Sequence, residues 1–560
     1  MILAVTVGLG LALGSVTPIQ SLSAEYLRAL WKTSPMTASQ VGYHKEGVDR
    51  RLDELTPSAR ARRAAWLHGF ESRLETAAKK SSDREDGADA ELLRQSIALE
   101  LLDLDEAHDF SRRCDQPLDN LGSTFFMMTA RSYAPFERRA QDVAARLGAV
   151  PRYLAEAQAG LTTDVDVFRE AARDDGEGLI DYLQHDLEQA FKNSNSRSKI
   201  DAGVAQAVKA VRGYLDFVAV ELPKRPKGTF RYGKALYDKR FRPYLQTDRA
   251  PDEVLGAARR RLAEIKGEMA KLAQKIVPSG DVREALALVA KDHPAPAELF
   301  ATVRKQLDQA RAFVVEKNLL TLAPQDTLRV IETPPFLRSQ LGVAAFDGAP
   351  PLQPELGAFF YVTPFPSDWP KAKVEAKLRE YNRYMLALIT IHEAMPGHYV
   401  QFEHANRVQP ETRRVLRWVL GSNAYIEGWA SYAQELMVDA GFMQSDPKLR
   451  LEEDKLELRA VTNAILDIEL HTQNLSDADA LSLMEDGAYQ ERPEAELKLR
   501  RAKLSVTQLC SYFVGDEAWR QIRKAAEEAR GRGFELRAFH DRALAEGAVP
   551  LPTLRALLLR

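Results

Sequence analysis

The stretch from Ile391 to His404 reads IHEAMPGHYVQFEH, and the interpretation of the whole chain depends on it. His392 and Glu393 begin as the HExxH helix of metallopeptidases begins, with an imidazole that can bind a metal and an adjacent carboxylate that can activate water. The second histidine, His398, comes two residues later than that motif requires. Residues six apart on a straight helix point about 120° apart. The two imidazoles therefore converge only if the helix breaks between them.

Two residues between the histidines favour such a break. Pro396 has no N–H to donate to the carbonyl oxygen of His392, and Gly397 can adopt backbone angles that are closed to other residues. We predict that the helix stops being regular between Met395 and His398, and that the break returns the second imidazole to the metal.

An apolar stripe leads up to the first histidine. Its members recur at alternating spacings of four and three and are followed by His392: Val374, Leu378, Tyr381, Met385 and Leu388. This spacing is that of one face of a helix. It predicts one continuous helix from Lys371, with His392 pointing inward at its end.

A zinc site with two histidines needs a third protein ligand, commonly a carboxylate on a following helix. The helical segment NAYIEGWASYAQELMVDAG carries Glu427 and Glu435 on one face. We choose Glu427 as the ligand because it follows His398 by 29 residues, enough for one helix to end and another to return. Glu435 is then expected to orient a ligand or to bind substrate, although the two glutamates can exchange these roles.

Further along the chain, three residues are candidates for the remaining roles in hydrolysis. The developing oxyanion needs a hydrogen-bond donor, and the hydroxyl of Tyr512 and the imidazole of His471 are of the right kind. Arg501 can bind a substrate carboxylate with two hydrogen bonds. Spacing alone fits structural roles for all three equally well. His404 is expected to support a ligand or to be exposed.

Hydrophobic periodicity predicts a mainly α-helical fold that forms a large cleft, with a small β-sheet beside the site. Residues 25–325 are a series of amphipathic helices. Residues 326–560 are the metallopeptidase-like region, packed with the first as one functional unit. Short β-prone runs lie at Thr327–Thr333 and Gly357–Thr363. The second run, GAFFYVT, is either an edge strand that pairs with a substrate backbone or a strand that only completes a core.

The composition excludes several classes of partner. The chain has 560 residues with 77 basic and 80 acidic side chains, a net charge of −3, and therefore gives no reason to expect nucleic acid or an anionic membrane. The two cysteines, Cys114 and Cys510, are expected to be ordinary buried thiols. A metal must then be held by His, Glu or Asp.

The first 24 residues predict a signal peptide. The apolar run MILAVTVGLGLALG is followed by small residues at Ser21, Ser23 and Ala24 that suit cleavage, which favours a periplasmic or secreted protein. A basic segment before the apolar run is missing, so a cytoplasmic protein with a buried N-terminal helix is the alternative. No later segment has the roughly 18 apolar residues that a membrane span needs.

Taken together, HEAMPGHYVQ, EGWASYAQE, DIELHT and SYFVG resemble the bacterial "domain of unknown function 885" family, whose members look like gluzincin-type zinc peptidases. The resemblance covers most of the chain, including the early Gly42-Tyr43-His44 and the GAFFYVT run. It implies a role for six residues. Those roles are zinc ligands His392, His398 and Glu427, catalytic base Glu393, and site residues Tyr512 and His471.

The chain departs from the family pattern near Arg501. Val506 and Thr507 stand where the family usually has Pro-Gly, and Ala502 stands where it usually has a tyrosine. These differences concern substrate recognition by Arg501 and leave the metal site unaffected.

The sequence therefore predicts a zinc-dependent peptidase that cleaves short peptides, of oligopeptidase or carboxypeptidase type. Two other classes use the same residues differently. One is a metal-dependent amidase acting on a non-peptide substrate, and the other is a non-catalytic helical binding protein derived from a peptidase.

Overall fold

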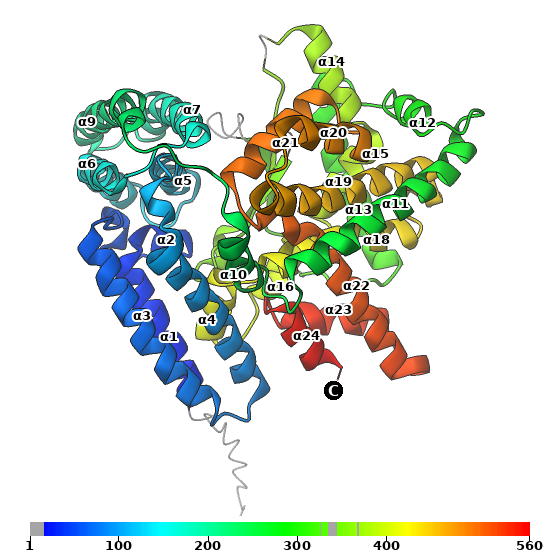
Figure 1. Cartoon of the computed structure of the whole chain (residues 1–560), viewed down its shortest axis with the longest axis horizontal. Coiled ribbons are helices and arrows are strands. Elements are labelled where there is room, and N and C mark those ends of the chain that lie inside the picture. Colours follow the sequence, from blue (N-terminus) through cyan, green and yellow to red (C-terminus); the bar gives the residue numbers. More distant parts are fainter. Residues whose placement is uncertain (1–15, 325, 334–343, 367–368, 560) are drawn as a thin grey trace, which may run out of the picture.

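The computed structural model describes residues 16–324, 326–333, 344–366 and 369–559 (Figure 1). Most of them lie in helices, and the strands form one small sheet, so the predicted mainly α-helical fold is confirmed. Among the helices so described, none has the length and apolar character of a membrane span. The apolar run of the predicted signal peptide lies outside the described residues, and the small residues Ser21, Ser23 and Ala24 lie inside α1.

The N-terminal helices form two layers on one side of the molecule, coloured blue to cyan on the left of Figure 1. In chain order they are α1 (Pro18–Thr33), α2 (Pro35–Gln40), α3 (Pro57–Ala78), α4 (Arg84–Leu102), α5 (Gln116–Ala130), α6 (Phe136–Gly160), α7 (Asp166–Tyr182), α8 (Glu188–Ala190) and α9 (Arg197–Asp216). Both layers share apolar cores with later parts of the chain. The core of α1, α3 and α4 includes Val415 and Leu416, and that of α5 to α9 includes Phe359 and Tyr361.

The remaining helices surround the long, buried α19 and fill the other side of Figure 1. In chain order they are α10 (Gly233–Leu245), α11 (Pro251–Ile276), α12 (Val282–Val289), α13 (Leu299–Glu316), α14 (Lys371–Glu380), α15 (Arg383–Glu393), α16 (His398–Ala405), α17 (Glu411–Val419), α18 (Asn423–Asp439), α19 (Pro447–Thr472), α20 (Asp477–Ala488), α21 (Arg492–Leu504), α22 (Ser511–Arg530), α23 (Leu536–Ala545) and α24 (Leu551–Leu558). The apolar faces of most of these helices form the largest core, whereas α20 and α21 pack with the end of α19 in a smaller one.

The sheet has the strand order β1 (Leu328–Glu332), β3 (Ala358–Val362), β2 (Ala344–Asp347). Strand β1 pairs with β3 in parallel and β2 pairs with it antiparallel. The GAFFYVT run therefore contains the central strand, and its role as a substrate-binding edge is wrong. All five residues of β3 are buried, as expected for a continuous apolar run that is covered on both faces. It completes a core, which was the other expectation.

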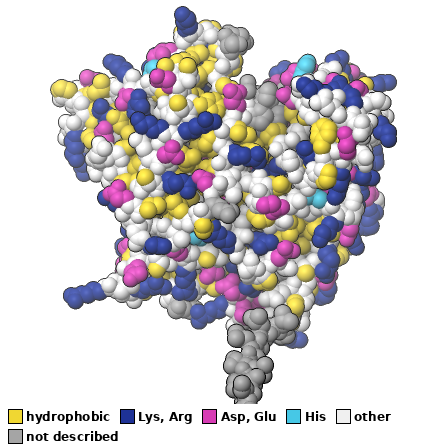
Figure 2. All heavy atoms as spheres, turned by 180° about the vertical axis from the view of Figure 1, so that it is seen from behind, with side chains coloured by type: hydrophobic (Ala, Val, Ile, Leu, Met, Phe, Trp, Pro, Cys, Tyr) yellow, Lys and Arg dark blue, Asp and Glu magenta, His cyan; other side chains and the backbone are white. Residues whose placement is uncertain are grey.

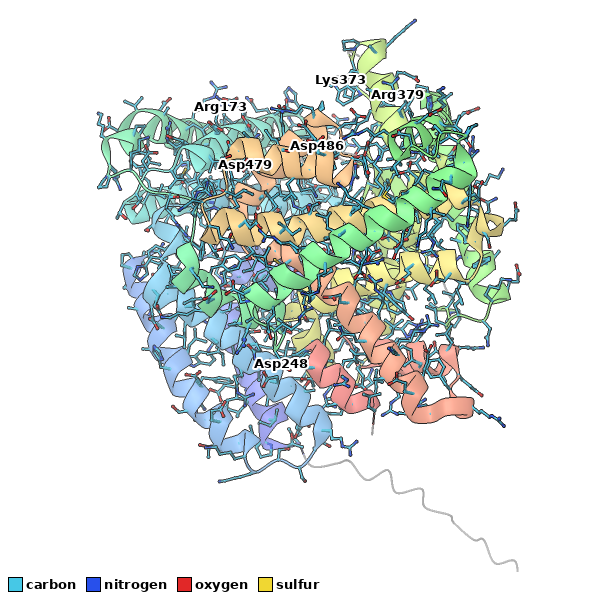
Figure 3. All side chains as sticks on the ribbon, turned by 45° about the vertical axis from the view of Figure 1, so that its right-hand side comes forward. Arg173, Asp248, Lys373, Arg379, Asp479 and Asp486 are labelled. Carbon is cyan, nitrogen blue, oxygen red and sulfur yellow. The ribbon has the colours of Figure 1, made fainter. Side chains whose placement is uncertain are left out.

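The helix predicted from Lys371 to the first histidine is two helices. The chain turns at Asn382, whose side chain accepts hydrogen bonds from the main-chain N–H groups of Tyr384 and Met385 and so caps α15. The prediction of one continuous helix missed this cap because the apolar spacing continues across it. Figure 3 shows Lys373 and Arg379 of α14 at the periphery, whereas most of α15 is buried.

The molecular surface carries both signs of charge close together. On the face shown in Figure 2, Lys and Arg side chains are interspersed with Asp and Glu side chains. This distribution agrees with the nearly balanced composition of the chain.

Candidate metal centre

The helix that bears the first histidine ends where the sequence predicts a break. Helix α15 ends at Glu393, and Ala394 leaves helical geometry with φ −129° and ψ −71°. A new helix, α16, begins at His398 after Gly397, which has φ −67° and ψ −130°. The predicted irregularity between Met395 and His398 is therefore confirmed, and it starts one residue earlier.

Gly397 is required by the close approach of the chain to itself at this break. A Cβ atom there would lie 1.9 Å from the carbonyl oxygen of His392 and 2.3 Å from that of Ile391. The indole Nε1 of Trp429 donates hydrogen bonds to the carbonyl oxygens of Pro396 and Gly397, at 3.0 and 3.2 Å. The tryptophan of the EGWA motif thus satisfies the carbonyl groups that the break releases.

The break brings both imidazoles to one carboxylate. Nε2 of His392 and Nε2 of His398 each lie 3.6 Å from Oε2 of Glu427. One donor atom from each residue lies within 4.8 Å of the others. Two donors at zinc bond lengths in a tetrahedral site stand about 3.4 Å apart. The three side chains, which come from three helices, therefore fit a zinc ion.

These three side chains remain open to the solvent although they are closely surrounded. The exposed fractions of the His392, His398 and Glu427 side chains are 16, 10 and 22%. Burial alone would raise the pKa of Glu427, but hydrogen bonds with both imidazoles hold this pKa well below its ordinary value. The pKa of His392 is raised overall, because burial lowers it by less than the nearby carboxylates of Glu427 and Glu393 raise it. The carboxylate of Glu427 is therefore ionised and ready to bind a cation.

Glu393 lies beside the donors and has a different environment. Burial raises its pKa, while the two imidazoles and a hydrogen bond from the main chain of Phe346 oppose that increase. Phe346 belongs to β2, and its ring also lies over His398 with the centroids 6.2 Å apart. The small sheet thus lies beside the site, as predicted, but the strand that reaches the site is β2, which the sequence analysis missed.

Gln434 contacts the imidazole of His392 at Nδ1, the nitrogen that does not face Glu427. The sequence did not predict this residue. Its Oε1 lies 3.3 Å from Nδ1 of His392, and its Nε2 donates to the carbonyl oxygen of Leu388 at 3.0 Å. The Leu388 carbonyl accepts only, so the amide presents its oxygen to His392, and Nδ1 must carry the proton. Nε2 is then left with its lone pair directed at the metal position. The available signal was the spacing of seven residues, two helical turns, from Glu427.

Glu435 is not placed among the metal donors. Its Oε1 accepts from Nη1 of Arg520 at 3.4 Å, and Arg520 also pairs with Glu457 and Asp516. The structure thus assigns Glu435 to an ion-pair network between α18, α19 and α22, while Glu427 occupies the position next to both histidines.

Tyr512 is brought toward the centre by a contact between two helix backbones. A Cβ atom on Gly428 would lie 2.3 Å from the carbonyl carbon of Gly515, so α18 and α22 touch where neither has a side chain. Glu427 precedes one of these glycines, and Tyr512 lies one turn before the other. Burial and the charge of Glu427 raise the pKa of Tyr512. Nη2 of Arg501 donates to the Tyr512 hydroxyl at 3.2 Å.

His471 contacts the main chain at the end of α21, just before Tyr512. Its imidazole is 2% exposed, and Nε2 lies 3.2 Å from the carbonyl oxygen of Ala502 and 2.9 Å from that of Ser505. Burial lowers its pKa. The nitrogen that would donate to an oxyanion is already engaged with the main chain, so the geometry favours a positioning role for His471 over the predicted donor role.

Three further predicted residues lie away from the donors. His404 is buried with Nε2 2.9 Å from the carbonyl oxygen of Thr321, so it is neither exposed nor beside a ligand. Cys114 and Cys510 are both buried free thiols, as expected.

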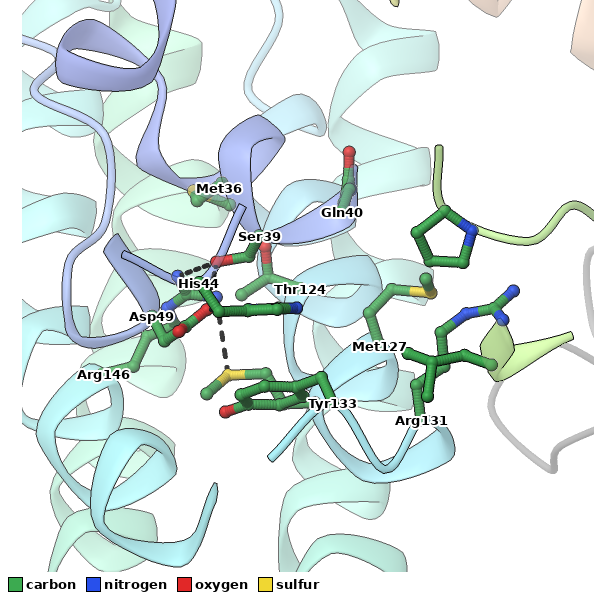
Figure 4. A pocket seen from close by; sticks show the side chains of 13 residues that line it. Met36, Ser39, Gln40, His44, Asp49, Thr124, Met127, Arg131, Tyr133 and Arg146 are labelled. Atoms are coloured by element: carbon green, nitrogen blue, oxygen red, sulfur yellow. Dashed lines mark hydrogen bonds and ion pairs between the residues drawn. The ribbon is translucent and has the colours of Figure 1, made fainter. Parts of the chain in front are cut away.

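His44, from the early Gly-x-His of the family resemblance, lies in a separate pocket among the N-terminal helices (Figure 4). Its Nδ1 and the hydroxyl of Ser39 each lie 2.8 Å from Oδ1 of Asp49, and its ring stacks on Tyr133 at 4.2 Å. Nη2 of Arg146 donates to the Ser39 hydroxyl at 2.9 Å. These contacts join α2 and α6 to the segments that follow α2 and α5.

Two solved structures resemble the whole chain. A protein described as a putative lipoprotein of unknown function, from Shewanella oneidensis, has 26% sequence identity and a TM-score of 0.82, and the match covers 97% of this chain and 100% of that one. A second protein, described as a putative lipoprotein from Colwellia psychrerythraea, has 17% identity and a TM-score of 0.78 over 97 and 99% of the two chains, which shows a shared fold.

The search of curated proteins found no significant match. Residues 35–558 match the model of a family described as "Bacterial protein of unknown function (DUF885)". This match confirms the family that HEAMPGHYVQ and EGWASYAQE predict, and the chain belongs to the DUF885 family of bacterial proteins.

Proposed function

We propose that the chain is a zinc-dependent peptidase of gluzincin type that hydrolyses short peptides. The observation that carries this proposal is the convergence of His392, His398 and Glu427 on one point. Glu393 follows His392 in the chain, and both imidazoles act electrostatically on its carboxylate. Two imidazoles and one carboxylate with solvent access are the ligand set of catalytic zinc sites, which keep one position open for water or substrate.

The chain's own residues can divide the hydrolytic work. A zinc ion held by the three donors supplies Lewis acidity, which makes a water molecule acidic enough to attack a carbonyl group at neutral pH. Glu393 takes the proton of the attacking water and passes it to the nitrogen of the leaving amine. The Tyr512 hydroxyl donates to the oxygen of the tetrahedral intermediate.

A periplasmic or secreted location belongs to the same proposal. The apolar run at residues 1–14 has the composition of a signal peptide, and the relative from Shewanella oneidensis is described as a putative lipoprotein. Peptides that reach the cell envelope are then the available substrates.

Replacement of Glu393 by Gln tests the proposal. The variant should keep one zinc ion per chain, measured by elemental analysis, and should lose peptide hydrolysis by roughly 10²–10⁴-fold because the general base is gone. Glu411→Gln is the matched control, since that carboxylate pairs with Arg414 at the surface of α17. A purified wild-type chain that takes up much less than one zinc ion, or a Glu393→Gln variant that hydrolyses at the wild-type rate, would contradict the proposal.

A further inference from the structure

Helix α21 carries five basic residues, and two of them differ from the rest. Arg500 pairs with Asp174 at 2.6 Å, Lys503 pairs with Asp477 at 2.6 Å, and Arg492 pairs with Glu496 at 2.8 Å. Lys498 and Arg501 have no acidic side chain within ion-pair distance among the residues that the structure describes. They are three positions apart, so they lie on the same side of the helix.

Both side chains are within electrostatic reach of the metal centre. The carboxylate of Glu427 raises the pKa of both Lys498 and Arg501, and that of Glu494 also raises the pKa of Lys498. Nη2 of Arg501 lies 3.1 Å from Oε1 of Gln508 and 3.2 Å from the hydroxyl of Tyr512. These contacts fix the guanidinium beside the tyrosine and leave its other N–H groups free. The side chain is exposed, so a solute can reach it.

The environment of Lys498 indicates excess positive charge. Burial, followed by the charges of Arg501 and Arg459, lowers the pKa of Lys498 to about 7. Arg459 is itself neutralised by an ion pair with Glu380. The carboxylates of Glu494 and Glu427 oppose this decrease only in part. An ammonium group beside a guanidinium, neither of them in an ion pair with an acid of the described residues, favours the binding of an anion.

We propose that Lys498 and Arg501 form a subsite for the C-terminal carboxylate of a short peptide whose scissile bond lies at the metal centre. This inference rests on the proposed peptidase function. The terminal carboxylate is the anion that every unmodified peptide carries, and a guanidinium can bind its two oxygens together. The subsite makes the enzyme one that acts near the C-terminus of its substrates, and an amidated peptide is a poor ligand.

The test compares N-acetyl-trialanine with its C-terminal amide. Binding of each to the zinc-loaded Glu393→Gln variant is measured by titration calorimetry, so that hydrolysis does not interfere. The free acid should bind about 10- to 100-fold more tightly than the amide, as expected for a hydrogen-bonded charge. In the same background, Arg501→Gln and Lys498→Met should each reduce this ratio toward one.

Neighbouring basic residues of the same helix provide matched controls. Arg500→Gln and Lys503→Met remove a positive charge of the same kind but at positions paired with acids, and they should leave the preference for the free acid unchanged. Circular dichroism and thermal melting show whether each variant is folded. Arg501→Lys, which keeps the charge, should retain part of the preference.

The outcomes separate this inference from the proposed function. If the free acid and the amide are hydrolysed equally well by the wild-type chain, the peptidase stands and the subsite is wrong. If the free acid binds preferentially but is not hydrolysed, the subsite stands and the peptidase is wrong. Equal binding of the two probes, absence of binding, or an unchanged ratio in both Arg501→Gln and Lys498→Met overturns the subsite.

Discussion

Gln434 shows how a neutral side chain can set the chemistry of a metal ligand. It accepts from Nδ1 of His392 and is itself oriented by the carbonyl oxygen of Leu388. An imidazole held in this way keeps its Nε2 lone pair directed at the metal and does not rotate.

Replacing Gln434 by Met should therefore weaken zinc binding while leaving the fold intact. The methionine side chain has a similar length but cannot accept the Nδ1 proton well, so we expect a loss of about 10- to 100-fold in zinc affinity. Competition with a chromogenic chelator measures this loss. Glu435→Gln is the control at the next position and should not change the affinity, because that residue contacts Arg520. A large effect of Glu435→Gln instead would mean that the two positions have the opposite roles.

The sequence predicts the residues of the centre that belong to a motif and misses those that do not. His392, His398 and Glu427 are found from their spacing and converge in the structure. Gln434 and Lys498 are not found, because an amide or a lysine on a helix has no pattern that separates a supporting role from a solvated one. Their roles follow from the neighbours that tertiary packing supplies.

At the scale of single elements, the packing of α18 on α22 depends on a pair of glycines. A Cβ atom on Gly428 would meet the carbonyl carbon of Gly515 at 2.3 Å, and one on Gly515 would meet the carbonyl oxygen of Ala424 at 2.0 Å. The same two helices are joined by a hydrogen bond, in which the indole Nε1 of Trp519 donates to the carbonyl oxygen of Tyr425 at 3.0 Å. The EGWA and SYFVG motifs thus pack against each other.

Gly428→Ala should push these helices apart and move the neighbouring Glu427. We expect a loss of about 3 kcal/mol of unfolding free energy, because the collision is with main-chain atoms that cannot rotate away. Weaker zinc binding should accompany the loss. Urea denaturation and zinc titration measure the two effects. The control is Gly267→Ala on α11, where an added Cβ meets nothing within 4 Å and stability should stay equal or rise by up to about 1 kcal/mol.

Elements were predicted well where the local signal is strong and poorly where two signals compete. The helix break before His398 follows from Pro396 and Gly397 and is present. The turn at Asn382 was missed, because the apolar spacing runs through it and outweighed the capping signal of one asparagine. Strand β2 was missed because its four residues are too short to show an alternation, and its identity as a strand depends on pairing with β3.

At the scale of the whole molecule, buried ion pairs join the N-terminal helices to the half that contains the metal centre. The side chain of Asp89 on α4 is 2% exposed. Its Oδ2 lies 2.6 Å from Nε of Arg413, and its Oδ1 lies 2.7 Å from Nε of Arg417. Both arginines belong to α17, which follows α16 and precedes α18. The first helices of the chain therefore hold the segment between the second histidine and Glu427.

Asp89→Asn should destabilise the whole molecule. It removes the carboxylate shared by two buried guanidinium groups that each keep a second acidic partner, so the loss should be about 1.5–3 kcal/mol of unfolding free energy. Thermal melting followed by circular dichroism measures the change. The surface pair of Glu411 and Arg414 serves as the comparison, since Glu411→Gln should change stability by less than about 1 kcal/mol. A small effect of Asp89→Asn would show that the apolar core alone joins these helices.

The break at Gly397 also bears on how this centre tolerates insertions and deletions. In an HExxH helix the helical repeat fixes the offset between the histidines, so any change in their separation destroys the site. Here His398 starts its own helix, and its direction is set by the few backbone angles at Ala394 to Gly397. Removing two residues to restore the shorter spacing would change the direction of α16 and move His398 with it. A change in the number of residues between the histidines is therefore tolerated only if the backbone angles of this corner change with it.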